Sequence, residues 1–415
     1  MTRILFKNVR ILDCTGAAPF PGQVLVENEC IGGVWRREQA IDVADAEILE
    51  GNGATLMPGL IEPHSHLSFT DCARSVDMGF IPPEEHMLIT MRNARKMLEM
   101  GFTSCFSAAS AKPRLDVVLR NAIDAGEFPG PRTLAASPEM TVTGGLGDVR
   151  LSHLYRENFA VVLDGPLEFR RYARLMCREG VDTLKINISG DAGTPASPSR
   201  TTVMSADEIA EVCEVARAHN KRLAAHTRSA ESVKLALKNG VEVLYHATFI
   251  DTEAQDMLEA QRDRVFVAPT LGNLQATLQK AASFGIALSP AHQRDLQDEI
   301  AAGIENMKAL HRRGVRVLPG GDYGFAVAPI GTNARDIELF VELLGFTPMD
   351  AIVAATRSGA QIMNMSEQTG LVKKGFLADL LLVDGDPTRD VGILQQEQNL
   401  LAVMKGGTFY KRKTP

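Results

Sequence analysis

The stretch PGLIEPHSHLSF, residues 58–69, finishes an apolar run with two histidines one residue apart, His64 and His66. Residues two apart in extended backbone point to the same side, so the two imidazoles would share one face of a strand. Histidine is not a typical core residue, and at the end of a buried strand it needs a hydrogen-bond partner or a ligand. The stretch therefore predicts a buried strand with functional groups at its carboxyl end.

Helical and strand patterns alternate through the middle of the chain that surrounds this stretch. PEEHMLITMRNARKMLEMG precedes FTSCFSA, and SADEIAEVCEVARAHN, with a capping box of Ser205 and Glu208, precedes KRLAAH. Glycines stand where helix C-caps are expected, at Gly101, Gly180, Gly240 and Gly314. About eight strands, counting ATLMPGL as the first, predict an α/β protein with a (β/α)8 TIM barrel over residues 56–365. A doubly wound open sheet is the alternative.

Both ends of the chain read as short strands separated by glycine-rich turns, as in GQVLVENECIGGVW and GLVKKGFLADLLLVDGD. Neither end can bury a two-faced sheet alone. We therefore predict one small β-sandwich domain assembled from residues 1–55 and 366–415.

The composition is that of a globular protein, with 45% hydrophobic and 23% charged residues and a net charge of -7. The charges form no long runs of one sign, which disfavours a nucleic-acid or anionic-membrane partner and leaves a small-molecule substrate. Six scattered cysteines and an N-terminus without a continuous apolar segment predict a cytoplasmic protein. A homo-oligomer is expected for this architecture.

Four further residues with metal-ligating side chains stand at or near the ends of predicted strands: Lys185 in TLKINIS, His226 in RLAAH, His246 in VEVLYH and Asp322 in VRVLPGGD. A single histidine at a strand end is more often structural, and Asp beside Gly is common in turns. A lysine inside an apolar strand is harder to explain, because burying an ammonium is costly. Since the carboxyl ends of barrel strands meet at one mouth, the six residues together predict a metal site there.

These motifs resemble those of the amidohydrolase superfamily. LMPGLIEPHSHL is similar to its Pro-Gly-Leu-Ile-Asp-x-His-x-His signature, and GLVKKGFLADLLLVDGDP to its C-terminal strand segment. DAGEFPGPRTLAAS, TGGLGD and HTRSAESVKLALKNGVEVLYHATF resemble the imidazolonepropionase-related branch. That branch includes Xaa-Pro dipeptidases, metal-dependent carboxypeptidases, and hydrolases of phenylureas and thiocarbamates.

The resemblance implies a hydrolase of carbon–nitrogen bonds with two divalent metal ions, expected to be zinc. His64 and His66 would hold the more buried ion with Asp322, His226 and His246 the other, and a carbamylated Lys185 would bridge them. The ions would share a hydroxide that attacks an sp² carbon, and Asp322 would pass its proton to the departing nitrogen. Lys185 and Asp322 are thus the expected catalytic residues.

The substrate is less constrained. Peptidases of the branch carry T-G-G-H-G-D where this chain has TGGLGD, so Leu146 replaces a histidine that faces the substrate. A polar substrate group would lose its partner there, at about 1–3 kcal/mol, which favours an amide, urea or carbamate-like substrate. The expected substrate contacts are Leu146, Arg150, His153, Arg228, Tyr245, Phe249 and Tyr323, the arginines as carboxylate binders in competition with salt bridges.

Several other functions stay open from the residues alone. A peptidase of the Xaa-Pro dipeptidase or carboxypeptidase type, a lactonase or phosphotriesterase, and a deaminase could all use such a site. A catalytically silent scaffold is disfavoured because no ligand position is missing. The other histidines, His86, His219, His292 and His311, are read as structural.

Overall fold

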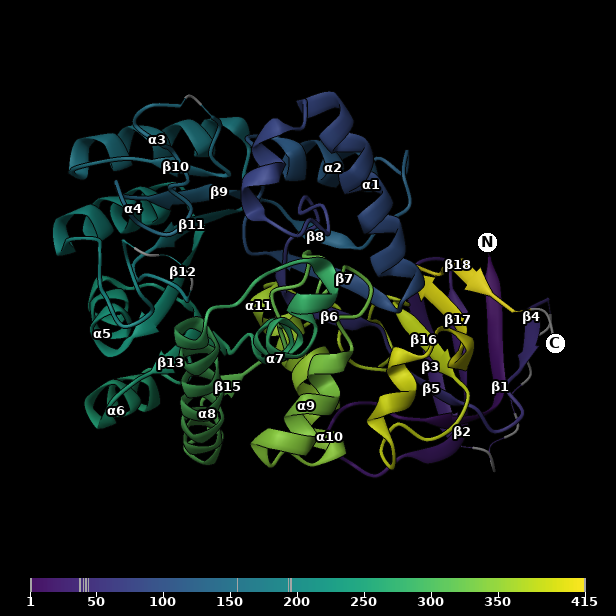
Figure 1. The fold of residues 1–415 in the computed structure, drawn as a ribbon. Helices are drawn as coiled ribbons and strands as arrows, with labels where there is room; N and C mark the ends of the chain where they lie inside the picture. Colours follow the sequence, from purple (N-terminus) through teal and green to yellow (C-terminus); the bar gives the residue numbers. More distant parts are fainter. Residues whose placement is uncertain are drawn as a thin grey trace.

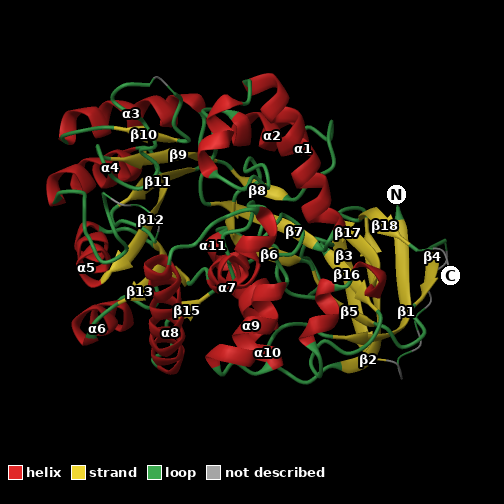
Figure 2. Ribbon diagram, viewed as in Figure 1, coloured by secondary structure: helices red, strands yellow, loops and turns green. Residues whose placement is uncertain are grey.

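The computed structural model describes residues 2–36, 39, 41, 43, 45–154, 156–192, 194 and 196–413. A lobe made of strands lies to one side of a larger part in which strands and helices alternate (Figures 1 and 2). The first and last strands of the chain, β1 (Arg3–Ile11) and β18 (Thr408–Arg412), both lie in the lobe of strands. None of the described helices has the length and apolar character needed to cross a membrane.

The terminal strands form one eight-stranded sheet in the order β18-β17-β16-β5-β1-β2-β3, with β4 paired to β1. Their bounds are β1 Arg3–Ile11, β2 Phe20–Glu27, β3 Cys30–Arg36, β4 Glu47–Glu50, β5 Thr55–Pro58, β16 Leu380–Val383, β17 Leu400–Lys405 and β18 Thr408–Arg412. The two ends of the chain therefore do assemble together. The hydrogen bonding unites them in one sheet, however, where the sequence led us to expect a sandwich of two.

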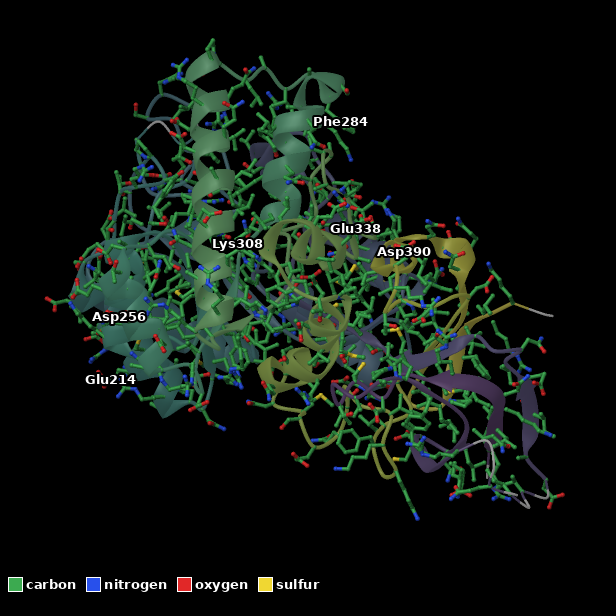
Figure 3. All side chains as sticks on the ribbon, turned by 90° about the horizontal axis from the view of Figure 1, so that it is seen from below. Glu214, Asp256, Phe284, Lys308, Glu338 and Asp390 are labelled. Atoms are coloured by element: carbon green, nitrogen blue, oxygen red, sulfur yellow. The ribbon has the colours of Figure 1, made fainter. Side chains whose placement is uncertain are left out.

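The alternating side chains of β16 explain how a single sheet can cover two hydrophobic cores. Leu380 and Leu382 pack into a small core of the terminal lobe, whereas Leu381 and Val383 pack into the main core of the larger part. Side chains that point to opposite faces thus serve two cores. Figure 3 shows Glu338 of helix α9 (Arg335–Leu344) near Asp390 at this junction, where the amide of Gln395 donates to Glu338 across 2.7 Å.

Parallel strands build the larger part, and all of them but one follow one another in chain order. The seven-stranded sheet runs β10-β9-β11-β12-β13-β14-β15, and a three-stranded sheet runs β6-β7-β8. The strands are β6 Leu60–Ser65, β7 Phe102–Ser107, β8 Arg132–Leu134, β9 Ala136–Thr141, β10 Ala160–Val162, β11 Thr183–Asn187, β12 Arg222–Ser229, β13 Val243–Phe249, β14 Phe266–Ala268 and β15 Arg316–Val317. Only Ala135 separates β8 from β9, so one segment joins the two sheets.

Strand order distinguishes this arrangement from the alternative that the sequence left open. A doubly wound sheet reverses its strand order at a switch point, whereas these strands, apart from the short β10 on the outer side of β9, follow the order of the chain. The larger part is therefore TIM-barrel-like. Over the described residues no ladder joins β15 to β6.

Helices follow most of these strands and cover the outside of the sheets (Figure 2). They are α1 Pro83–Glu99, α2 Leu115–Asp124, α3 Pro166–Glu179, α4 Ala206–Ala218, α5 Ala230–Asn239, α6 Thr252–Ala260, α7 Leu271–Lys280, α8 Pro290–Arg312, α9 Arg335–Leu344, α10 Pro348–Val353 and α11 Gly359–Ile362. The capping box of Ser205 and Glu208 at the start of α4 is confirmed. Gly180 and Gly240 end α3 and α5 in the left-handed conformation.

The run ATLMPGL does not form a single barrel strand, because it divides at Gly59. Up to Pro58 the chain pairs with β16, and from Leu60 it pairs with β7. The amide of Gly59 donates to Asp379 and that of Leu60 to Gly101, both across 2.9 Å. A side chain at residue 59 would collide with Thr103, so glycine is needed where the strand changes partners. The terminal sheet thus extends to residue 58, past the predicted boundary at 55.

Candidate active site

His64 and His66 lie at the carboxyl end of β6, each 1% exposed. Nδ1 of His66 is 3.2 Å from the carbonyl oxygen of Ala109, to which it can only donate. In the neutral form of this ring Nε2 carries a lone pair, and it lies 3.0 Å from Oδ1 of Asp322. Two acceptors at this distance require a proton or a cation near both, so the pair fits a metal ion.

His226 on β12 and His246 on β13 bring a second pair of imidazoles to the same place, with ring centroids 4.3 Å apart. Burial lowers the pKa of both rings well below the usual value, and the charge of Arg228 lowers it further. Both rings are therefore neutral, the form that binds metals. Nδ1 of His246 is buried and has no hydrogen-bond partner among the described residues, which leaves a donor set that a cation would complete.

Asp322 follows β15, and its backbone is in the left-handed region with φ 61. Burial alone would raise the pKa of Asp322, but His64, His66 and Lys185 together lower it below its ordinary value. The carboxylate therefore stays ionised. One ligand atom each from His64, His246 and Asp322 lie within 4.8 Å of one another, close enough to share a metal ion.

Lys185 lies in the middle of β11 and is 1% exposed. Its Nζ is 3.9 Å from Oε1 of Glu139 and 4.4 Å from the ring centre of Tyr245. Burial lowers the pKa of the Lys185 amine, although the charges of Glu139 and Asp322 oppose that shift. The amine is thus more readily unprotonated than a surface lysine.

All six predicted ligands, His64, His66, Lys185, His226, His246 and Asp322, line one cavity of about 520 Å³. Residues from distant strands meet there because parallel strands present their carboxyl ends at one mouth. The donor set of imidazoles and a carboxylate suits a divalent metal ion.

Of the predicted substrate contacts, Leu146 and Arg228 line this cavity. Phe249 instead lines a neighbouring cavity of about 540 Å³, where Arg200 lies over its ring at 3.7 Å. Arg150 and His153 are exposed and are not among the lining residues of either cavity, and Arg150 pairs with Asp148 across 3.0 Å.

The two tyrosines are also absent from the cavity walls, because both are buried behind ligand residues. The ring of Tyr245 stacks on that of His64, and its hydroxyl donates to the carbonyl of Pro63 across 3.0 Å. Tyr323, 3% exposed, points toward Gly272 and Asp336. Both rings thus pack behind candidate ligands rather than in the cavity wall, and a contact of either ring with the substrate stays a prediction.

Several cavity residues escaped the sequence reasoning. Glu139, Arg156, Asp191, Asn273 and His292 all line the cavity. Glu139 could have been noticed as a carboxylate inside a strand pattern, as Lys185 was. The others sit in loops or helices whose sequence gives no sign of facing a cavity, and His292 had been read as structural.

Comparison with known proteins shows to which family the chain with this site belongs. A model of the amidohydrolase family matches residues 55–409. The chain belongs to the amidohydrolase family. The resemblance inferred from the sequence motifs is thereby confirmed.

Three relatives of this amidohydrolase bear on its chemistry. Ochratoxinase from Aspergillus niger is 25% identical over 375 residues, covering 86% of this chain and 75% of the relative. Enamidase from Eubacterium barkeri is 23% identical over 372 residues, covering 87% of this chain and 81% of the relative. A prolidase crystallised with N-methylphosphonate-L-proline is 26% identical, with a TM-score of 0.88, covering 99% of this chain and 100% of its own.

The family and these relatives identify the chain as a metal-dependent hydrolase of carbon–nitrogen bonds. Amidohydrolases generally use divalent metal ions, and the described residues include the cluster of two histidines and an aspartate.

Proposed function

We propose that this amidohydrolase cleaves an amide, urea or carbamate-like bond of a small molecule with two zinc ions in a closed (β/α)8 barrel. The observation that carries the proposal is the meeting of four histidines, a lysine and an aspartate in one cavity. His64, His66 and Asp322 would hold the more buried ion, and His226 and His246 the other. Bound zinc would lower the pKa of water and polarise the substrate oxygen.

Lys185 would bridge the ions after reaction with carbon dioxide. Its unprotonated amine attacks the carbon of CO₂ and loses a proton, which leaves a carbamate anion. Burial favours the uncharged amine, and the anion gains the attraction of the cations. An ammonium paired with Glu139 is the competing state, and it would lack the added carbon.

Asp322 would transfer a proton from the attacking water to the leaving nitrogen. Its carboxylate stays ionised and is 20% exposed on the cavity side, so it can accept a proton from the attacking water. It would then return this proton to the leaving nitrogen, since an amine leaves poorly as an anion. The low pKa of Asp322 fits a group that accepts a proton only briefly.

The experiment is a hydrolysis screen on protein prepared with zinc and bicarbonate, using N-acyl amino acids, Xaa-Pro dipeptides, anilides and phenylureas. Asp322→Asn and Lys185→Ala should each lower turnover by orders of magnitude, whereas Lys308→Ala, which removes only a partly exposed pair with Glu305 on α8, should not. Two zinc ions per chain and a ¹³C signal from labelled bicarbonate are expected for the wild type. Near-normal rates of both variants, or one zinc per chain, would contradict the proposal.

A dipeptidase is the second candidate, favoured by the likeness to the prolidase. Leu146 in the cavity wall weakens it, because leucine offers no hydrogen bond to a peptide group. Faster cleavage of Xaa-Pro dipeptides than of anilides would establish it. Preference for lactones or phosphotriesters, or release of ammonia, would indicate the other rivals. We also expect a cytoplasmic homo-oligomer.

A further inference from the structure

Three arginines line the catalytic cavity among the described residues: Arg74, Arg156 and Arg228. A guanidinium group binds carboxylates through paired donors, so each is a candidate for an anionic part of the substrate. An arginine whose charge is already balanced by a carboxylate of the protein is a poor candidate, so the partners of each arginine decide which one can bind the substrate.

Arg228 is already paired with two carboxylates. It is 3% exposed, and its Nε donates to Asp191 across 2.8 Å while its Nη1 donates to Glu299 across 2.7 Å. Glu299 is itself 1% exposed and also accepts the hydroxyl of Ser199. A substrate carboxylate would be the third anion around one guanidinium, which is unfavourable in a buried setting.

Arg74 is also paired. Its side chain is 72% exposed, and Nη2 lies 2.7 Å from Oδ1 of Asp77. An exposed pair of this kind is strongly screened by solvent and contributes little. Neither Arg74 nor Arg228 thus offers an unmatched charge to the cavity.

Arg156 differs from both. It is half-buried, and its Nε donates to the backbone carbonyl of Val149. Within the described part of the chain, no carboxylate oxygen lies within the 4.0 Å that defines an ion pair. A carbonyl holds the side chain in place but does not neutralise it. Asn158 accepts the amide of Val149 across 3.1 Å, so the loop that carries Arg156 is itself fixed.

The cavity wall that includes Arg156 is apolar. Leu146, Val149, Phe69 and Phe159 line it. The ring of Phe69 packs edge-on against Phe159, with centroids 6.4 Å apart, and stacks on His66 at 4.1 Å. The apolar surface therefore runs from the region of Arg156 to a proposed metal ligand.

We propose that Arg156, and not Arg150 or Arg228, binds a carboxylate of the substrate. The enzyme then acts on amides in which a carboxylate lies next to an apolar group, such as N-acyl derivatives of apolar amino acids. This inference rests on the proposed function and narrows its substrate class.

The test compares N-acetyl-L-leucine with N-acetyl-L-leucinamide, which differ in the negative charge, on zinc-containing protein. Binding is measured by calorimetry, and hydrolysis as kcat/KM. The wild type should favour the acid by about tenfold or more, as expected for a charge-assisted hydrogen bond. Arg156→Gln should remove that preference and leave the amide within about twofold, while Arg156→Lys should keep part of it.

Arg150→Gln is the matched control, because it makes the same change of charge in the same loop but outside the cavity wall. It should leave both ligands unaffected. Equal effects of Arg156→Gln on both ligands, no preference in the wild type, or the same loss in Arg150→Gln would overturn the assignment. Selective binding of the acid without hydrolysis of any amide would instead refute the proposed function and leave Arg156 as the carboxylate receptor.

Discussion

The side-chain amide of Asn273 donates a hydrogen bond to the backbone carbonyl of Asp322 across 2.9 Å. The amides of Thr270 and Asn273 also donate to Gly320 and Gly321, across 3.2 and 3.1 Å. The first turn of α7 thereby holds the chain where Asp322 adopts φ 61, a conformation that costs free energy for a residue with a side chain.

Replacing Asn273 by Ala should lower kcat by about tenfold, because the Asp322 carboxylate would no longer be held in one orientation. Stability should fall by only about 1 kcal/mol, the typical value of one hydrogen bond. Steady-state kinetics and urea unfolding measure the two effects. Asn239→Ala, which removes a bond to the carbonyl of Leu235 far along α5, is the control and should leave kcat unchanged. An unchanged kcat in Asn273→Ala would show that Asp322 needs no such support.

Tyr245 supports His64 from behind, with ring centroids 3.7 Å apart and planes inclined by 13°. Tyr245→Phe keeps this stacking and loses only the bond to Pro63, so it should cost about 1 kcal/mol and retain the metal content. Tyr245→Leu removes the aromatic face and should lower zinc affinity by about tenfold or more, since groups behind a ligand orient it. Zinc competition against a chelating dye measures this. Equal affinities of the two variants would contradict the role of the ring.

Arg228 and Glu299 form a buried ion pair between β12 and α8. Glu299→Ala should destabilise the protein by about 3–5 kcal/mol, because it leaves a buried guanidinium without one of its partners. Glu305→Ala on the same helix breaks an exposed pair with Lys308 and should cost less than about 1 kcal/mol. Urea unfolding of both variants tests the contrast. Similar small losses would mean that Asp191 alone compensates Arg228.

Asp336 predicts a pH dependence of stability. Burial raises the pKa of Asp336 from its ordinary value of 3.8 to about 7, although the hydrogen bond it accepts from the amide of Gly272 lowers it. The unfolded carboxyl loses its proton at lower pH than the folded one, so the folded state binds more protons between about pH 4 and 7. This group therefore lowers stability as pH rises through that window, and the penalty persists above it.

Asp336→Asn cannot ionise and can still accept the amide of Gly272. Its free energy of unfolding relative to the wild type should rise between about pH 4 and 7 and then level off. Urea unfolding of both proteins at matched pH values gives this difference, in which contributions of other groups cancel. A difference that does not change with pH would refute the raised pKa.

Much of this architecture can be predicted from local sequence patterns. The histidine pair at the end of β6, the alternation of helix and strand, and the lysine within β11 are visible because each breaks or follows a periodicity that the chain itself supplies. The six predicted ligands thus came together in one cavity as expected.

Contacts between distant segments were harder to foresee. The stacking of Tyr245 on His64, the pairing of Arg228 with Glu299 and the exposure of Arg150 depend on which elements pack together, and a side chain type alone does not reveal it. The role proposed for Arg156 could not be predicted from the sequence for the same reason, because its lack of an acidic neighbour is a property of the folded loop. The single terminal sheet likewise depends on strand pairings hundreds of residues apart.

The change of partners at Gly59 ties the two parts of the molecule into one cooperative unit. A continuous backbone leaves the terminal sheet at Pro58 and enters the catalytic part at Leu60, so unravelling either side pulls directly on His64 a few residues away. Heat or denaturant should therefore melt the lobe of strands and the mouth of the cavity together, and the terminal strands, though remote from the chemistry, help to determine how firmly the proposed metal ligands are held.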